Sequence, residues 1–228
     1  MTIAAPTMLA TAPAAVLPAR RLPLWVKLAY SAFLAVLVPV YWRNYGPTNF
    51  LYFCDVALLV TLVGIWRESA LLVSMAAVGI LLPQLVWVVD FIAGLAGFTL
   101  TGMTAYMLNA KTPLYLRGLS LFHGWLPLLL IVLVWRLGYD RRAFWSWTVL
   151  AWVLMVVCVT AMPGPRADAG SIATPVNINY MHGLDDTREQ TWMPAWAWTA
   201  VMLAGMPLLI FLPTHLVLRR VCRPAARV

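Results

Sequence analysis

Long apolar segments alternate with short polar breaks along most of the chain. Six of these segments are close to the length of about 20 residues that crosses a bilayer as a helix. Charged or turn residues separate them, such as Gly46-Pro47 after the first and Arg67-Glu68-Ser69 after the second. The pattern predicts an all-α membrane protein, a six-transmembrane-helix bundle over residues 24–218. The predicted spans are 24–42, 48–66, 69–90, 119–138, 143–162 and 195–218.

The composition supports a membrane protein. Hydrophobic residues make up 63% of the 228 residues and charged residues only 11%, whereas a soluble domain usually carries about 25% charged residues. The net charge of +8 is therefore interpreted as a topology signal and as attraction to the membrane surface. We expect no nucleic-acid partner.

The distribution of Lys and Arg predicts the orientation of the bundle. If the N-terminus is inside, the inner segments carry eleven of the 16 Lys and Arg residues and the outer segments carry five. Both termini are then cytoplasmic, in the cell (inner) membrane. The flanks are predicted to be a disordered Ala/Pro-rich leader at 1–23 and a basic cytoplasmic tail at 219–228.

Two connections on the predicted outer side are long. Residues 91–118 include the apolar stretch "FIAGLAGFTLTG", which is too short to span and is interpreted as a re-entrant or interfacial piece. Residues 163–194 are polar. Loops of this length are usually functional or disordered.

Polar residues from three predicted helices fall at one depth near the outer boundary. At the helical rise per residue, Cys54 lies about 7–8 Å below that boundary, Gln84 about 9 Å and His123 about 6 Å. The polar outer loop emerges on the same side. It carries Asn177, Asn179 and Tyr180, which, with Gln84, we expect to bind the substrate or to stabilise an oxyanion.

These residue types fit acyl chemistry on a lipid. A thiolate is a strong nucleophile, a nearby histidine can take the thiol proton, and an amide such as Gln84 or Asn179 can stabilise an oxyanion. Ester carbonyls of a phospholipid lie at this depth, so the expected partner is a membrane phospholipid or other lipid ester. Asp55 lies about 100° around the helix from Cys54 and is interpreted as a tie to a neighbouring helix, and Asp90 as a second supporting residue.

Other readings of the same residues stay open. Each polar side chain can simply join two helices, which describes a non-enzymatic lipid-binding or complex-stabilising protein. A transporter is less favoured, because no internal repeat is evident and the inner half is almost purely apolar. No HxxxH or HExxH spacing indicates a metal, and His215 lies at the opposite side, so we expect no metal or other cofactor.

The order of these polar landmarks resembles a known family. The motifs are "FCD" (53–55), "QLVWVVD" (84–90), "LFHGW" (121–125) and "NINYM" (177–181). The pattern is similar to the YwaF-like integral membrane proteins, the group that includes animal transmembrane protein 164, over roughly residues 48–215. The resemblance implies a phospholipid acyltransferase with Cys54 and His123 as its reacting pair.

More distant relatives of that family imply a lipid-ester hydrolase that uses Thr and His. Thr48 and Thr61 are present, but Thr48 sits at the membrane boundary and Thr61 lies deeper. The cysteine is therefore the preferred nucleophile.

Overall fold

The computed structural model describes residues 22–169 and 174–225. The predicted leader lies almost entirely outside the described residues, as do the last residues of the predicted tail. Within the described ranges the chain is helical and forms no strand, which confirms the all-helical prediction. One isolated bridge between Tyr139 and Pro224 holds the C-terminal segment to the turn that follows residue 137.

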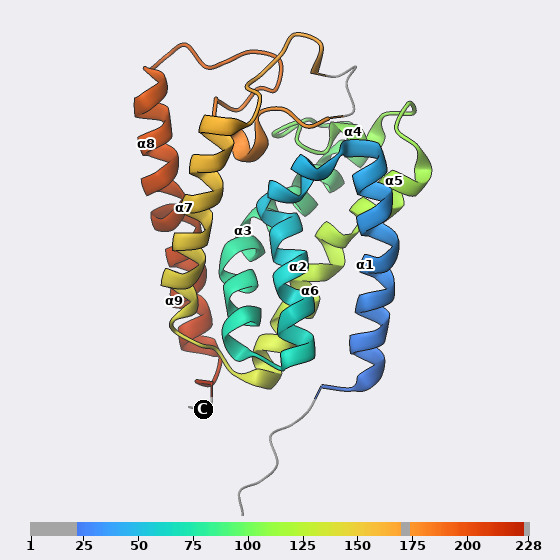
Figure 1. The fold of residues 1–228 in the computed structure, drawn as a ribbon, viewed down its shortest axis with the longest axis vertical. Coiled ribbons are helices and arrows are strands. Elements are labelled where there is room, and N and C mark those ends of the chain that lie inside the picture. Colours follow the sequence, from blue (N-terminus) through green and yellow to red (C-terminus); the bar gives the residue numbers. More distant parts are fainter. Residues whose placement is uncertain (1–21, 170–173, 226–228) are drawn as a thin grey trace, which may run out of the picture.

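The first three apolar segments form an up-down-up arrangement (Figure 1). They comprise α1 (Leu24–Tyr45), a 3-10 turn η1 (Pro47–Leu51), α2 (Phe53–Arg67) and α3 (Ala70–Leu95). Glu68 ends α2 in a left-handed conformation, and Ser69 caps α3 by accepting a hydrogen bond from the Leu72 amide. Lys27 pairs with Glu68 at 2.6 Å and so fixes the start of α1 to this turn.

The prediction for residues 91–118 needs correction. α3 continues to Leu95, so the first residues of the apolar stretch complete α3 and do not form a re-entrant piece. Gly97, with φ of 87°, follows its end. A single turn, α4 (Ala105–Leu108), and then α5 (Leu114–Ser120) lead into α6 (Phe122–Leu137), so this apolar helical stretch begins near Leu114 and not at 119.

The last two apolar segments form α7 (Ala143–Ala161) and a final interrupted helix. The interrupted helix consists of α8 (Ala195–Gly205), a π-helical turn η4 (Met206–Phe211) and α9 (Leu212–Val221). Pro207 and Pro213 each lack the amide hydrogen that a regular α-helical ladder needs, which accounts for the irregular turn between them.

Five helical stretches are long and apolar enough to cross a membrane, which supports a multi-pass membrane protein. These are Leu24–Tyr45, Ala70–Leu95, Leu114–Leu137, Ala143–Ala161 and Ala195–Val221. α2 is not among them: its 15 residues extend about 22 Å, less than the hydrocarbon core of about 30 Å.

Both described ends of the chain lie at one end of the bundle, which we call the terminal end (Figure 1). The long connections lie at the other end, the loop end. α3 is the central helix, since it packs against α2, α6, α7 and α9. Gly79 of α3 has no side chain and so leaves room for the Trp147 ring of α7. A Cβ at residue 79 would lie 1.9 Å from that ring.

Candidate functional site

The packing of α2 on α3 sets the level of the candidate residues. A Cβ on Gly64 would lie 3.0 Å from the Val73 side chain, so these two positions face each other. The helices run in opposite directions with the same rise. Gln84, eleven residues beyond Val73, is therefore level with Phe53, eleven residues before Gly64. This level is the N-terminus of α2, beside Cys54.

Cys54 is the second residue of α2 and carries a free, partly buried thiol. The backbone N–H groups of residues 54 and 55 face its sulfur, as expected in the first turn of a helix. The phenols of Tyr106 and Tyr180 lie within electrostatic range of it. Burial raises the pKa of Tyr180 to about 12 and raises that of Tyr106 as well, so both phenols remain neutral hydrogen-bond donors.

His123 lies in the first turn of α6 and is held by stacking and by one hydrogen bond. Its ring stacks on Trp87, with centroids 4.7 Å apart and an interplanar angle of 15°, and on Phe122. Its Nδ1 lies 2.8 Å from the Ser120 carbonyl oxygen. A carbonyl only accepts, so Nδ1 carries the hydrogen and Nε2 is the basic nitrogen of the neutral ring.

The structure does not bring Cys54 and His123 into contact. Among the described residues, no hydrogen bond, ion pair or ring contact joins the two side chains. The imidazole hydrogen-bonds to the Ser120 carbonyl oxygen, whereas the thiol interacts with the backbone N–H groups at the start of its own helix. The structure thus does not support a preformed Cys–His pair.

Ser120 links α1 to His123, a connection that the sequence analysis missed. Its hydroxyl lies 2.8 Å from the Tyr41 hydroxyl, while its carbonyl oxygen bonds the His123 ring. Tyr41 lies in turn within electrostatic range of Asp55. The spacing of three between Ser120 and His123 was the available signal, since it allows a bond within one helical turn.

Asp55 is buried, with 3% of its surface exposed. Its Oδ2 accepts a hydrogen bond from Asn49 Nδ2 at 3.0 Å, and its Oδ1 has no partner in the described part of the chain. Asn49 belongs to η1, immediately before α2. The observed hydrogen bond is therefore local, and the expected tie to a neighbouring transmembrane helix stays a prediction.

The Gln84 side-chain amide is buried without a hydrogen-bond partner in the described part of the chain. Its side chain is 2% exposed, and neither its amide oxygen nor its amide nitrogen has a hydrogen-bond partner among the described residues. Trp87, one turn further along α3, interacts with the Tyr106 phenol. Buried polar groups are nearly always hydrogen-bonded, so the Gln84 amide points to a polar group that completes it.

These side chains form one connected group, which we call the buried polar cluster. Asp55 lies within electrostatic range of Tyr41, and contacts then run from Tyr41 to Ser120, His123 and Trp87. Gln84 lies on the same face of α3 as Trp87. The cluster draws on four apolar segments and lies near the loop end of the bundle.

The polar outer loop closes over the start of α2. Asn179 Oδ1 accepts a hydrogen bond from the Phe53 amide at 3.1 Å, and its Nδ2 donates to the Leu51 carbonyl. Asn177 holds the loop itself, since its Nδ2 donates to the Gly183 carbonyl and its Oδ1 accepts from the His182 amide. Both amides thus have structural partners, and their expected role in substrate binding stays a prediction.

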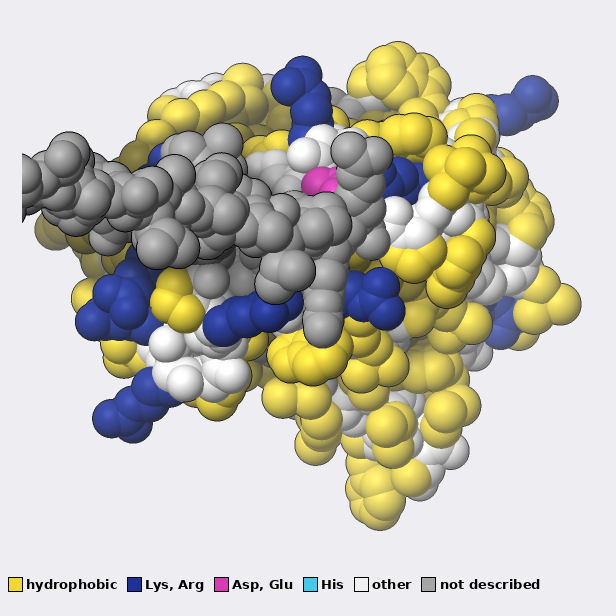
Figure 2. Space-filling view, turned by 90° about the horizontal axis from the view of Figure 1, so that it is seen from below, with side chains coloured by type: hydrophobic (Ala, Val, Ile, Leu, Met, Phe, Trp, Pro, Cys, Tyr) yellow, Lys and Arg dark blue, Asp and Glu magenta, His cyan; other side chains and the backbone are white. Residues whose placement is uncertain are grey.

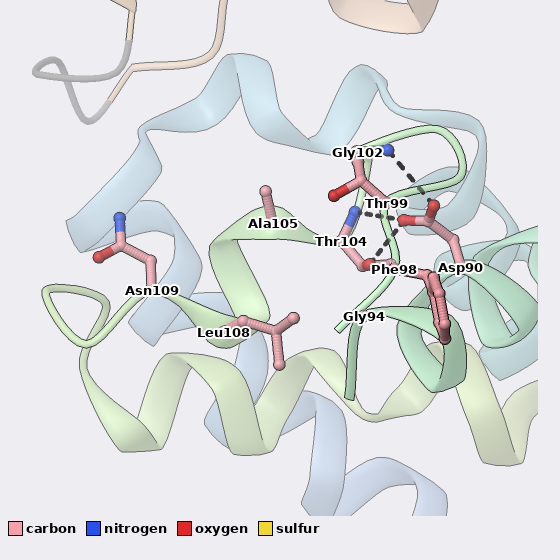
Figure 3. Close-up of a pocket in the computed structure, with 9 residues that line it drawn as sticks. All are labelled: Asp90, Gly94, Phe98, Thr99, Gly102, Thr104, Ala105, Leu108 and Asn109. Carbon is pink, nitrogen blue, oxygen red and sulfur yellow. Dashed lines mark hydrogen bonds between the residues drawn. The ribbon is translucent and has the colours of Figure 1, made fainter. Parts of the chain in front are cut away.

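Asp90 organises a turn and does not face the buried polar cluster. Its carboxylate accepts hydrogen bonds from the amides of Thr101, Gly102 and Thr104 and from the Thr104 hydroxyl, the last at 2.6 Å. Figure 3 shows the bonds from Gly102 and Thr104. Asp90 also lines a cavity of about 260 Å³. The other residues around that cavity are Gly94, Phe98, Thr99, Gly102, Thr104, Ala105, Leu108 and Asn109.

A second cavity, of about 340 Å³, lies next to the first and shares Gly102 with it. Its wall includes Tyr180 and the acidic pair Asp185 and Asp186. Cys54 and His123 line neither cavity. Within the described ranges, no three His, Cys, Asp or Glu side chains lie together in a way that would hold a metal ion.

Comparison with known proteins adds no further assignment: no protein-family model, no curated protein and no solved structure matches this chain. The resemblance to the YwaF-like group therefore stays a prediction.

Proposed function

We propose that this multi-pass membrane protein binds a lipid ester at the buried polar cluster and transfers its acyl group through Cys54. The observation that carries the proposal is the Gln84 amide, which is buried, unpaired among the described residues and level with the start of α2. An ester carbonyl supplies the acceptor that the amide nitrogen needs, and the hydroxyl of the compound that accepts the acyl group supplies the donor that its oxygen needs.

The depth of the cluster fits such a substrate. α2 extends about 22 Å from the level of Cys54 to the terminal end, most of a hydrocarbon core of about 30 Å, so the cluster lies near the headgroup level at the loop end. Because most Lys and Arg gather at the terminal end, we place that end in the cytoplasm and the cluster toward the opposite leaflet of the cell membrane.

The proposed reaction has two steps. The Cys54 sulfur attacks the ester carbonyl, a sulfur–carbon bond forms, the ester carbon–oxygen bond breaks, and the released alcohol takes the proton that the thiol gave up. The hydroxyl oxygen of a second compound then attacks the thioester carbonyl, the sulfur–carbon bond breaks, and the proton of that hydroxyl returns to the sulfur. Water as that second compound makes the reaction a hydrolysis. His123 acts as the base that takes the thiol proton on Nε2. For this the Nε2 atom must approach the sulfur when substrate binds, since catalytic hydrogen bonds often tighten only in the complex.

The test is to trap the acyl group. The purified protein is incubated with phospholipid vesicles, and peptides are analysed by mass spectrometry for a hydroxylamine-sensitive acyl group on Cys54. Cys158→Ser and Cys222→Ser are the matched controls and should keep the modification, whereas Cys54→Ser should lose it. An unmodified Cys54 in an active preparation would refute the thioester.

The second candidate is a non-enzymatic lipid-binding or complex-stabilising protein. It is favoured by one observation, that neither Cys54 nor His123 lines a cavity and the two side chains do not meet. It predicts that lipid binding depends on Gln84 but that Cys54→Ser changes nothing measurable.

A further inference from the structure

The charges of the protein are divided unequally between the two ends of the bundle. The described part of the terminal end carries eight Lys and Arg residues but only two acidic residues. The described part of the loop end carries five Lys and Arg residues and six acidic residues. Figure 2, which looks at the terminal end, shows dark blue side chains spread around this face and little magenta. The basic residues are Lys27, Arg67, Arg136, Arg141, Arg142, Arg219, Arg220 and Arg223.

Both acidic residues at this end already have a basic partner. Glu68 accepts from Lys27 at 2.6 Å, and Asp140 pairs with Arg142 at 2.7 Å. Within the described residues the remaining six arginines form no ion pair. Among the described residues, no acidic side chain neutralises the charge of these six arginines.

Four of these arginines gather where α6 and α9 end and α7 begins. We call them the basic cluster: Arg136, Arg141, Arg219 and Arg223. All four are exposed. Arg223 donates to the Arg136 carbonyl oxygen at 2.9 Å. The guanidinium groups of Arg141 and Arg219 both lie within electrostatic range of the His215 ring. The cluster thus brings together three helix ends.

The backbone around the basic cluster is fixed. The Tyr139 amide donates to the Arg223 carbonyl at 2.8 Å, and the Ala225 amide donates back to the Tyr139 carbonyl at 3.0 Å. The Tyr139 hydroxyl lies 2.7 Å from His215 Nδ1, so the turn before α7 is also joined to α9. The arginines are therefore held near one another by the fold.

The surroundings of the basic cluster are those of a membrane interface. Trp135 and Trp145 are exposed beside it, and Trp side chains favour the level of lipid headgroups. Further from the end, Val132, Val149 and Leu216 expose apolar surface on α6, α7 and α9. A ligand with a phosphate headgroup and acyl chains can contact both the arginines and the apolar helix faces. Each guanidinium group can donate two parallel hydrogen bonds to one phosphate.

We propose that the basic cluster binds the headgroup of an anionic phospholipid from the leaflet at the terminal end. The lipid phosphate lies among the arginines and its chains lie along the apolar outer faces of the helices. This site is separate from the buried polar cluster and does not depend on the proposed acyl transfer.

The experiment is a lipid-retention measurement on the full chain. The protein is reconstituted into vesicles of equal parts phosphatidylglycerol and phosphatidylcholine, extracted in mild detergent and analysed by native mass spectrometry. The natural sequence should retain phosphatidylglycerol several-fold over phosphatidylcholine. The double variant Arg141→Gln with Arg219→Gln should lose most of that preference.

The matched control removes the same charge at the loop end, in Arg43→Gln with Lys111→Gln, and should keep the preference. Equal loss in both double variants, or no loss in the first, would overturn the proposal. If the glutamine variant does not fold, Arg141→Lys with Arg219→Lys replaces it and should show a partial loss, because lysine keeps the charge without the paired donors. Displacement of the lipid by millimolar inorganic phosphate alone would also overturn it, since the acyl chains should contribute to binding.

Discussion

The Asn179 side chain caps α2 from 126 residues further along the chain. Its Oδ1 accepts from the Phe53 amide at 3.1 Å, and its Nδ2 donates to the Leu51 carbonyl and approaches the Cys158 sulfur at 3.5 Å. Asn179 adopts φ of 57°, in the left-handed region that Asn tolerates better than most residues. This contact connects the outer loop directly to the helix turn that carries Cys54.

Replacing Asn179 by Gly should release that turn. Glycine accepts the left-handed backbone, so the variant removes only the side-chain bonds, and a lost cap costs about 0.5–2 kcal/mol. We expect a lower unfolding temperature and faster labelling of Cys54 by a membrane-permeable maleimide. Asn109→Gly, at an exposed turn of the same end, is the control and should leave Cys54 labelling unchanged. Unaltered labelling in the Asn179 variant would contradict the capping role.

Replacing Gly79 by Ala should destabilise the packing of α3 on α7. The new methyl group would meet the buried Trp147 ring at 1.9 Å, so the helices must separate or the indole must move. Overpacking of this kind costs about 1–3 kcal/mol. Thermal unfolding in detergent measures it. At Gly205→Ala nothing lies within 4 Å of the added carbon, so that variant should be neutral or slightly stabilising.

Asp90→Asn should loosen the turn that follows α3. The substitution replaces one carboxylate oxygen, which accepts hydrogen bonds, by an NH₂ group, which only donates. At least one of the backbone N–H groups of Thr101, Gly102 and Thr104 then loses its acceptor. A buried donor left unpaired costs about 1–3 kcal/mol. Hydrogen exchange of residues 96–104 should accelerate, while Glu189→Gln, an exposed acid at the same end, should leave it unchanged. Equal exchange rates would mean that the carboxylate does not hold the turn.

Gln84→Leu separates the binding role of the buried polar cluster from a structural one. Because the amide has no partner among the described residues, an apolar side chain of similar size should leave the unfolding temperature unchanged or raise it. The same variant should reduce binding of the lipid ester. Gln190, whose amide both donates to and accepts from Met193, is the contrast, and Gln190→Leu should lower stability. A large loss of stability in Gln84→Leu would show that the amide is already satisfied within the protein.

The sequence determined the helical stretches and the depth of their polar residues. Apolar runs of bilayer length identify helices without reference to tertiary contacts, and the rise per residue is constant, so the common level of Cys54 and Gln84 follows from counting. The same counting placed the C-terminus of α3 too early and the start of the helical stretch that contains α6 too late. The residues at these two boundaries are apolar enough to form either helix or connection.

Only the tertiary structure decided what each polar side chain faces. The direction of a side chain around a helix depends on how that helix is rotated and packed, and depth along the axis does not fix it. Packing of α6 on α3 stacked His123 on Trp87 and left it without a contact to Cys54. The local turn η1 gave Asp55 a partner in Asn49, and the long outer loop brought Asn179 to α2. Two of these contacts join residues far apart in sequence, and the third joins residues on either side of a short turn. A periodic pattern of apolar and polar residues predicts neither kind of contact.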